Sequence, residues 1–364
     1  MKALYLYIHI PFCRKKCHYC DFYSIIPGQD VADRYLDALK RAVSFHAERC
    51  SGRYELRSIY FGGGTPNLLL PGRLEKVFDR IVSSFRIAED AEITIEINPE
   101  FAHDKDSIRP LADTGFNRLS VGVQSLRDDE LRMLGRLHDR DTALRCLEAA
   151  RNIFPNLSAD LIFALPGQRL PALEESLDTL LAFAPEHLSA YNLSCEPGTP
   201  LSEMVESGKI RLADEACERR FFLYLHETLG RHGYRHYEIS GYARPGRESR
   251  HNSAYWSGAD YLGLGPSAHS KLADTRHAYD PDLNRFLHEP CDFHHTEKVN
   301  DADLLITRLR TAEGVSREEA GKKTWKRLKE YAGERPAWFS VRNDRIACTP
   351  PGWLMLDSIL LDLI

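Results

Sequence analysis

Three cysteines near the amino terminus have the residue type and the spacing to hold a metal cluster. Cys13, Cys17 and Cys20 form a C-x3-C-x2-C pattern directly after an apolar run, residues 4–10, that predicts a buried strand. Thiolates are soft ligands, and cubane iron–sulfur clusters are held by closely spaced cysteines on a loop. Three thiolates for four irons would leave one iron open, where a small molecule could bind and react.

The alternatives are a zinc site or three structural thiols. Zinc sites usually use two pairs of closely spaced ligands. Among the nine cysteines, only Cys17 and Cys20 have a C-x2-C spacing. The spacing therefore favours a [4Fe–4S] cluster with one open iron.

Strand and helix patterns alternate through the first half of the chain, and these elements must position the cysteine loop. Apolar runs predict strands at residues 4–10, 58–61, 92–98, 118–123, 157–165 and 187–193. Amphipathic patterns predict helices at residues 31–49, 71–85, 104–114, 128–134, 141–153 and 171–183. Such alternation is typical of a parallel sheet with right-handed crossovers. Six units are fewer than the eight of a closed barrel, so we predict an α/β fold with an open, partial (βα)6 barrel.

Glycine, proline or polar residues follow each predicted strand, where barrels of parallel strands carry their reactive groups. The Gly62–Pro66 segment lets the backbone approach a ligand closely, and it lacks the Lys-Ser/Thr of a phosphate loop. Glu96 and Asp160 lie in predicted strands, and a buried carboxylate needs a partner. That partner is either a structural hydrogen bond or a bound ligand. Arg136 could pair with a ligand carboxylate or with Glu96, or lie solvated at a helix end.

The second half of the chain has a different pattern. A helix at 213–231 and a strand at 234–239 precede a turn-rich segment, 241–250, that we place at the edge of the barrel. Residues 301–364 predict helices, a two-stranded wing and a terminal apolar helix, which is a small winged-helix-like α+β domain. The predicted domains are 1–240 for the barrel, 241–300 for a segment that closes it, and 301–364 for the C-terminal domain.

Residues 251–256 gather polar and aromatic side chains that could bind haem. The segment contains His251, Asn252, Tyr255 and Trp256. Imidazole is a common axial ligand of haem iron, and flat aromatic rings suit the face of a macrocycle. A histidine in a polar, aromatic loop is more often a hydrogen-bonded structural residue. Composition alone therefore leaves haem binding open.

The whole chain fits a protein of the cytoplasm. It has 364 residues, a formal net charge of −5 and nine cysteines. An odd number of scattered cysteines fits a reducing compartment. We expect no secretory signal and no membrane span, because no apolar run approaches the ~18–20 residues that a span needs. Peripheral association with a membrane stays open. No basic excess calls for nucleic acid.

The cysteine pattern, with the aromatic Tyr19 before the last cysteine, resembles the radical S-adenosylmethionine (SAM) superfamily. The resemblance implies that the open iron chelates the amino and carboxylate groups of SAM. It also implies that the reduced cluster splits the sulfonium to give a 5′-deoxyadenosyl radical. The cofactor would then carry the hard chemistry, while the protein orients and shields it.

Motifs along almost the whole chain resemble the oxygen-independent coproporphyrinogen III dehydrogenase family. They are Y-I-H-I-P-F-C, Y-F-G-G-G-T-P, E-I-N-P-E, R-L-S-V-G-V-Q-S, D-L-I-F-A-L-P-G-Q and E-P-G-T-P. The resemblance implies a set of SAM-contacting residues, in which the GGG-T-P segment contacts the methionine amino group. By position these residues are Tyr7, Tyr19, Gly63, Gly64, Thr65, Glu96, Gln124, Arg136, Asp160 and Ser194.

Three features are similar to the haem chaperone (HemW) branch of that family. The dehydrogenases carry a fourth cysteine two residues after the third, where this chain has Phe22. The dehydrogenases also have a longer N-terminal extension than the six residues that precede Tyr7 here. The haem chaperone branch carries an H-N-x-x-Y-W motif, which residues 251–256 match at each fixed position. The haem-binding residues implied by this resemblance are His251, Asn252, Tyr255 and Trp256.

We therefore expect a haem chaperone that binds haem and a SAM-ligated [4Fe–4S] cluster and delivers haem to acceptor proteins, respiratory cytochromes among them. SAM and the cluster would gate transfer instead of driving turnover, so we assign no catalytic residue. Two enzymes remain open as alternatives: a coproporphyrinogen III dehydrogenase, which is an oxidoreductase, and a haem-modifying radical enzyme. A SAM-binding regulator without haem is the third alternative.

Overall fold

The computed structural model describes residues 1–28, 30–69 and 72–364. The strands of the first half pair in chain order and run parallel to one another. They are β1 (Lys2–Ile10), β2 (Tyr54–Gly63), β3 (Ile87–Ile97), β4 (Arg118–Gln124), β5 (Leu157–Phe163) and β6 (His187–Asn192). Each contains most of one predicted strand, so the strand pattern of the sequence is confirmed.

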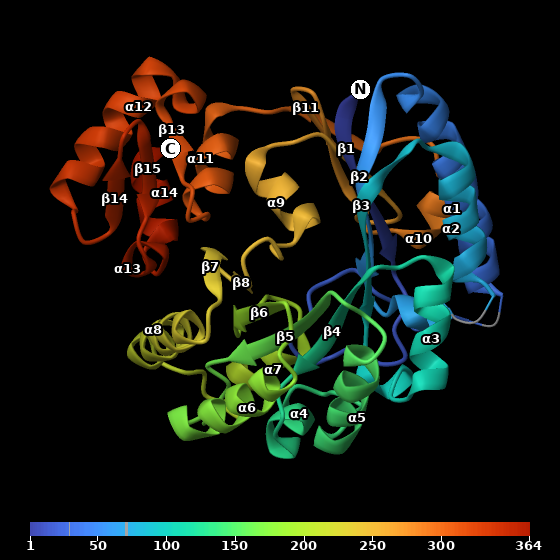
Figure 1. The fold of residues 1–364 in the computed structure, drawn as a ribbon, viewed down its shortest axis with the longest axis horizontal. Coiled ribbons are helices and arrows are strands. Elements are labelled where there is room, and N and C mark those ends of the chain that lie inside the picture. The colour runs from blue at the N-terminus through green and yellow to red at the C-terminus, as the bar shows by residue number, and fades with distance from the viewer. Residues whose placement is uncertain (29, 70–71) are drawn as a thin grey trace.

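Helices between these strands cover the outer face of the sheet (Figure 1). They are α1 (Val31–Cys50), α2 (Leu74–Ser84), α3 (Lys105–Thr114), α4 (Asp128–Met133), α5 (Arg140–Arg151) and α6 (Leu170–Ala182). Two short 3-10 turns, η1 (Pro66–Leu69) and η2 (Pro99–Phe101), follow β2 and β3. The helix predicted over 71–85 begins at Leu74, and Pro71 lies outside the described residues.

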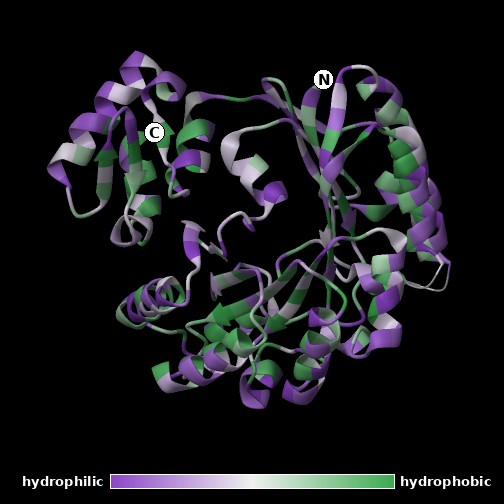
Figure 2. Ribbon diagram, viewed as in Figure 1, coloured by the Kyte–Doolittle hydropathy of each residue, from purple (hydrophilic) through white to green (hydrophobic). Residues whose placement is uncertain are grey.

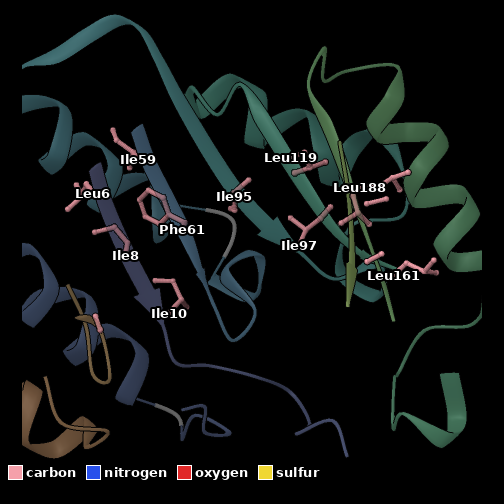
Figure 3. Close-up of a cluster of buried hydrophobic side chains, with 14 of the residues drawn as sticks. Leu6, Ile8, Ile10, Ile59, Phe61, Ile95, Ile97, Leu119, Leu161 and Leu188 are labelled. Carbon is pink, nitrogen blue, oxygen red and sulfur yellow. The ribbon is translucent and has the colours of Figure 1, made fainter. Parts of the chain in front are cut away.

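Side chains alternate between the two faces of the parallel sheet, as the period of two in a strand requires. In β1, Leu6 and Ile8 are buried in the apolar layer that also holds the helices, while Tyr7 and His9 point to the inner face. Figure 3 shows this apolar layer, and Figure 2 shows hydrophobic residues concentrated where helices meet the sheet. The inner face is instead polar. It carries Ser58, Tyr60, Glu96, Arg118, Asp160 and His187.

Short strands extend the sheet at both edges. Beyond β1 lie β9 (Tyr261–Leu264), β10 (His269–Leu272), β11 (Thr275–Ala278) and β12 (His295–Lys298). Beyond β6 lie β8 (Gly241–Ala243) and β7 (Arg235–Glu238). Within the described residues the sheet has twelve strands, in the order β12-β11-β10-β9-β1-β2-β3-β4-β5-β6-β8-β7. Its edges are β12 and β7, so the predicted open barrel is confirmed.

Several of these edge strands were not predicted from the sequence. The segment predicted as a turn, 241–250, contains β8, which pairs antiparallel with β6. Strand β9 pairs parallel with β1, which adds a parallel strand that the sequence did not predict. These strands have four residues or fewer, too few for a period-two pattern to stand out. The remaining elements of this region are α7 (Pro200–Glu206), α8 (Glu215–Arg231) and α10 (Leu283–His288).

Residues 250–257 form a helix, α9 (Arg250–Ser257), where the sequence analysis expected a loop. The Ser249 side chain accepts a hydrogen bond from the backbone N–H of Asn252, which caps the start of the helix. Gly258 adopts a left-handed conformation, with φ of 69°, which ends it. Ser249 before the segment and Gly258 after it were therefore the sequence signals for a helix. Figure 1 shows α9 between the first strands of the barrel and the C-terminal elements.

The C-terminal elements surround a second, antiparallel sheet with the order β13-β15-β14. They are α11 (Asp301–Leu309), β13 (Val315–Ser316), α12 (Arg317–Glu334), β14 (Phe339–Arg342), β15 (Arg345–Cys348), α13 (Pro350–Trp353) and α14 (Leu356–Leu363). The helices and the two-stranded wing agree with the prediction, and the predicted terminal helix, 353–363, corresponds to α14, which begins at Leu356 after the short helix α13. The domain boundaries at 240 and 300 stay a prediction. Among the described residues, no helix has both the length and the apolar character to cross a membrane.

Candidate functional site

A cavity of about 350 Å³ opens where the parallel strands of the barrel end. The three cysteines of the C-x3-C-x2-C pattern line it. All but one of the residues predicted to contact SAM line it too: Tyr19, Gly63, Gly64, Thr65, Glu96, Gln124, Arg136, Asp160 and Ser194. The fold thus brings together residues that lie up to about half the chain apart in sequence, which is the usual arrangement in barrels of parallel strands.

Tyr7 is the predicted residue that does not line this cavity. Its hydroxyl group lies 3.0 Å from Nδ1 of His9, and its ring is 6.1 Å from that of Tyr60. Tyr7 therefore lies deeper on the inner face of β1, behind the cavity. Its role in SAM binding stays a prediction.

The cysteine loop is fixed by backbone hydrogen bonds to distant segments. The N–H of Cys13 donates to the carbonyl of Ile25 at 3.0 Å, and the N–H of His18 donates to that of Leu134 at 3.0 Å. The Thr65 hydroxyl donates to Sγ of Cys13 at 3.6 Å. These contacts hold the thiols at one side of the cavity before any ligand binds.

The donor set fits a cluster held by three thiolates. Cys13, Cys17 and Cys20 are partly buried free thiols, and burial raises the pKa of Cys20 to about 11. Such thiols become thiolates when a metal binds them, which releases protons. Among the described residues, no three His, Cys, Asp or Glu side chains gather around the position of a single metal ion.

The glycine segment packs directly under the cysteine loop. Gly63 has φ of +106°, and a Cβ there would lie 2.5 Å from the His9 ring. A Cβ on Gly64 would lie 2.6 Å from the carbonyl oxygen of Phe12. The N–H of Gly64 donates to Ile10 at 2.7 Å, continuing the pairing of β1 and β2. These glycines are therefore required for packing as well as for an open cavity wall.

Glu96 has structural partners and also lines the cavity. Its carboxylate accepts hydrogen bonds from the Tyr60 hydroxyl at 2.7 Å and from the N–H of Gly63 at 3.1 Å. Burial raises the pKa of Glu96 to about 7, and the nearby carboxylate of Asp160 adds to the rise. Burial likewise raises the pKa of Asp160 to about 6. The cavity therefore holds two carboxyl groups that resist losing both protons at once.

Arg136 connects the cysteine loop to the strand ends. Its Nη2 donates to Oδ1 of Asn98 at 2.7 Å and to the carbonyl of Gly122 at 3.0 Å, while Nη1 lies 3.5 Å from Sγ of Cys17. It is partly buried, so the solvated arginine considered from the sequence is wrong. It also contacts Asn98 and not Glu96. A positive charge beside a cysteine stabilises the thiolate form.

Two features of Gln124 are typical of a residue that contacts a ligand. Oε1 of Gln124 is buried and has no hydrogen-bond partner among the described residues. Gln124 also has φ of 64°, an unusual conformation for a residue with a side chain. Unpaired buried polar atoms and strained backbone are found together at ligand sites. Asn98 is a further site residue that the sequence did not predict, and its side-chain amide also donates to the Thr65 hydroxyl at 2.9 Å.

The H-N-x-x-Y-W motif lies on α9, and its histidine faces the barrel. Nδ1 of His251 lies 2.7 Å from the Ser58 hydroxyl, and Nε2 lies 2.6 Å from the Tyr255 hydroxyl. The ring stacks on Tyr60 with a centroid distance of 4.9 Å. Burial lowers the pKa of His251 to about 3, so the ring is neutral. Both ring nitrogens are thus hydrogen-bonded, and haem ligation by Nε2 would first require breaking the contact with Tyr255.

The other residues of the motif have different surroundings. Trp256 lies under the guanidinium group of Arg310, at 3.8 Å from the ring centroid. Its Nε1 is buried without a hydrogen-bond partner among the described residues. Asn252 is partly buried, and its backbone N–H binds the capping serine. The structure therefore does not place these four side chains around one point, and their part in haem binding stays a prediction.

Comparisons with known proteins agree with this site. The model of the "Radical SAM superfamily" matches residues 7–180. The "Heme chaperone HemW" of Bacillus subtilis (strain 168) is 38% identical over 272 residues, which cover 74% of this chain and 71% of that protein. The HemW of Escherichia coli (strain K12) is 34% identical, covering 88% of this chain and 85% of that protein.

Two further matches extend over almost the whole chain. "Radical S-adenosyl methionine domain-containing protein 1, mitochondrial" of Danio rerio is 32% identical, covering 98% of this chain and 85% of that protein. The solved structure of coproporphyrinogen III oxidase (HemN) from Escherichia coli matches with a TM-score of 0.82 and 25% identity, covering 99% of this chain and 89% of that one. The chain therefore belongs to the radical SAM superfamily, in the HemN-like family and on its HemW branch.

Proposed function

We propose that this protein is a haem chaperone that holds a SAM-ligated [4Fe–4S] cluster and delivers haem to acceptor proteins. The observation that carries the proposal is its likeness to several proteins named heme chaperone HemW, at 34–38% identity. The side chain at position 22 agrees with it. Phe22 lines the cysteine cavity and is 57% exposed, where the dehydrogenase pattern has a fourth cysteine.

The cysteine cavity would hold the cluster and SAM. Cys13, Cys17 and Cys20 would bind three irons, and the fourth iron would take the amino and carboxylate groups of SAM. The backbone at Gly63 and Gly64 would line the methionine part of SAM. Arg136 would keep the Cys17 thiolate in place, and the amide of Gln124 is available to a ligand. In this proposal SAM and the cluster control haem transfer and are not consumed in a turnover.

The acceptor proteins in this proposal are haem proteins of respiration. We propose that the chaperone works in the cytoplasm and visits the membrane surface to reach them.

A second candidate is an oxygen-independent coproporphyrinogen III dehydrogenase. The observation that favours it is the match to the HemN structure over 99% of this chain. The two candidates differ in what they do to a porphyrin: the chaperone releases haem unchanged, while the dehydrogenase removes carboxyl groups from its substrate. Incubation of the reconstituted protein with coproporphyrinogen III, SAM and a reductant tests the dehydrogenase directly.

The test of the chaperone proposal is a haem titration of anaerobically reconstituted protein, followed by the Soret band. Wild type and His251→Ala are compared with His46→Ala as the matched control. His46 is also buried and also bonds a tyrosine, with Nε2 at 3.0 Å from the Tyr279 hydroxyl, but it lies on α1. We expect saturable binding in wild type and in His46→Ala, and loss of binding in His251→Ala.

Other outcomes would change the proposal. Equal binding by all three proteins would move the haem site away from His251. No saturable binding by wild type would contradict the chaperone proposal. Tyr255→Phe adds a sharper test of ligation, because it removes the hydroxyl that occupies Nε2. If Nε2 binds the iron, this variant should bind haem at least as tightly as wild type.

A further inference from the structure

Helix α9 has two faces, and only one of them holds the motif histidine. His251 and Tyr255, four residues apart, face the strands of the barrel. Residues at helical spacing on another face line a second cavity of about 560 Å³: Arg250, Ser253, Ala254 and Ser257. Trp256 lines this cavity as well. The H-N-x-x-Y-W motif thus places its histidine on the buried face of α9, and its tryptophan at the second cavity.

The second cavity lies at the opposite end of the barrel from the cysteine loop. It is lined by Tyr5 near the start of β1 and Arg57 near the start of β2. At roughly 3.3 Å per strand residue, the β1 segment from Tyr5 to Ile10 alone spans about 16 Å. The C-terminal elements close the other side through Arg308 and Thr311. Figure 1 shows α9 between these two parts of the fold.

The lining of this cavity is rich in arginine. Of the described residues, four arginines and two glutamates line it, and the arginines are Arg57, Arg235, Arg250 and Arg308. Arg57 and Arg250 each lie 3.1 Å from the carboxylate of Asp90, and their side chains are 45% and 52% exposed. Surface ion pairs of this kind are weak, so both guanidinium groups are available to a stronger anion. Guanidinium groups bind carboxylates through two parallel hydrogen bonds.

Aromatic rings supply the other half of a binding site. Trp256, Tyr5 and Tyr237 line the cavity together with the arginines. The indole N–H of Trp256 is buried and has no hydrogen-bond partner among the described residues, an arrangement that costs stability in the absence of a ligand. A volume of about 560 Å³ is within the usual range for small-molecule and cofactor pockets. The lining therefore suits a flat, largely apolar ligand that carries carboxylates at its edge.

We propose that this second cavity is the haem-docking site, with the macrocycle against Trp256 and the propionates on the arginines. The proposal rests on the haem chaperone function proposed above. In this arrangement the His251 ring stays on the barrel side of α9 and acts as a positioning residue: it bonds Ser58, and Glu92 accepts the N–H groups of Arg250 and His251, each at 3.2 Å. The loss of haem binding expected for His251→Ala then follows from displacement of α9 and its cavity face. The SAM cavity lies at the far end of the strands, so SAM acts on haem only through the protein.

Binding of two porphyrins to two variants tests this site. The porphyrins are haemin and haemin dimethyl ester, in which both propionates are neutral. The first variant replaces three exposed cavity arginines: Arg57→Ala, Arg235→Ala and Arg250→Ala. The control variant removes the same charge from exposed arginines elsewhere on the surface: Arg80→Ala, Arg109→Ala and Arg219→Ala. All titrations use the reconstituted full chain and the Soret band.

We expect wild type to bind haemin about tenfold or more tightly than the ester, since hydrogen bonds to charged groups are individually strong. The cavity variant should bind haemin about as weakly as wild type binds the ester, and it should no longer distinguish the two porphyrins. The control variant should behave as wild type. Equal discrimination by wild type and the cavity variant would overturn the site but leave the chaperone function. No saturable haemin binding by wild type would overturn both.

Discussion

Replacing Glu96 by glutamine should change how the stability of the cluster-free protein depends on pH. The pKa of Glu96 rises from 4.5 to about 7 on folding, chiefly through burial. Between these two values the folded protein keeps a proton that the unfolded chain has released. The free energy of unfolding of wild type therefore falls as the pH rises through this interval.

The size of the effect follows from the pKa shift. One pKa unit corresponds to about 1.4 kcal/mol, so the shift from 4.5 to about 7 corresponds to about 3 kcal/mol. Glutamine has a similar shape and can still accept the N–H of Gly63 and bond the Tyr60 hydroxyl. Glu96→Gln should therefore gain about 2–3 kcal/mol relative to wild type between about pH 5 and about pH 8.

Urea unfolding of cluster-free wild type and variant, followed by tryptophan fluorescence at both pH values, measures this difference. Glu89→Gln is the matched control, because Glu89 is an exposed glutamate on the same strand, β3. The difference in stability between Glu89→Gln and wild type should not change with pH. A difference between Glu96→Gln and wild type that stays constant from about pH 5 to about pH 8 would show that folding does not raise the pKa of Glu96.

Other substitutions test the cavity itself. Gly63→Ala should destabilise the protein by about 1–3 kcal/mol more than Gly52→Ala, because both glycines have positive φ but only Gly63 lacks room for a Cβ; equal thermal unfolding of the two variants would contradict this. Arg136→Lys should lower the iron and sulfide bound per protein after reconstitution, since an ammonium group cannot bond Cys17, Asn98 and the Gly122 carbonyl in the fixed geometry of the guanidinium; unchanged iron content would show that this geometry is dispensable. Cys20→Ala should lose most of its cluster absorbance while Cys291→Ala keeps it, and cluster formation in both would argue against the three-cysteine ligand set.

The sequence predicted the fold well where long, regular patterns determine the positions of residues. Six apolar runs separated by amphipathic helices predict the parallel barrel, and strand ends bring Gly63, Glu96 and Asp160 to one cavity. The alternation within strands also follows from sequence: Leu6 and Ile8 are buried among the helices, and Tyr7 points inward. These features follow from local periodicity and from the geometry of parallel sheets.

The sequence was less informative where short elements and long-range contacts determine which residues lie together. The four residues of β9 pair with β1 from more than half the chain away, and a short strand has too few positions to show a period. Helix α9 has eight residues, and its cap signals are those of many turns. Nothing local indicates that Ser58 would meet His251, or that Arg57 and Arg308 would line one cavity.

If this protein hands haem to an acceptor, the rate of haem loss from the loaded protein should depend on that acceptor. Haem-loaded protein is mixed with increasing concentrations of a haem-free respiratory acceptor, and separately with an excess of a passive haem scavenger. A haem chaperone should transfer haem to the acceptor faster than it loses haem to the scavenger, at a rate that rises with acceptor concentration. A transfer rate equal to the loss to the scavenger, and independent of acceptor concentration, would show that the protein is not a haem chaperone for this acceptor.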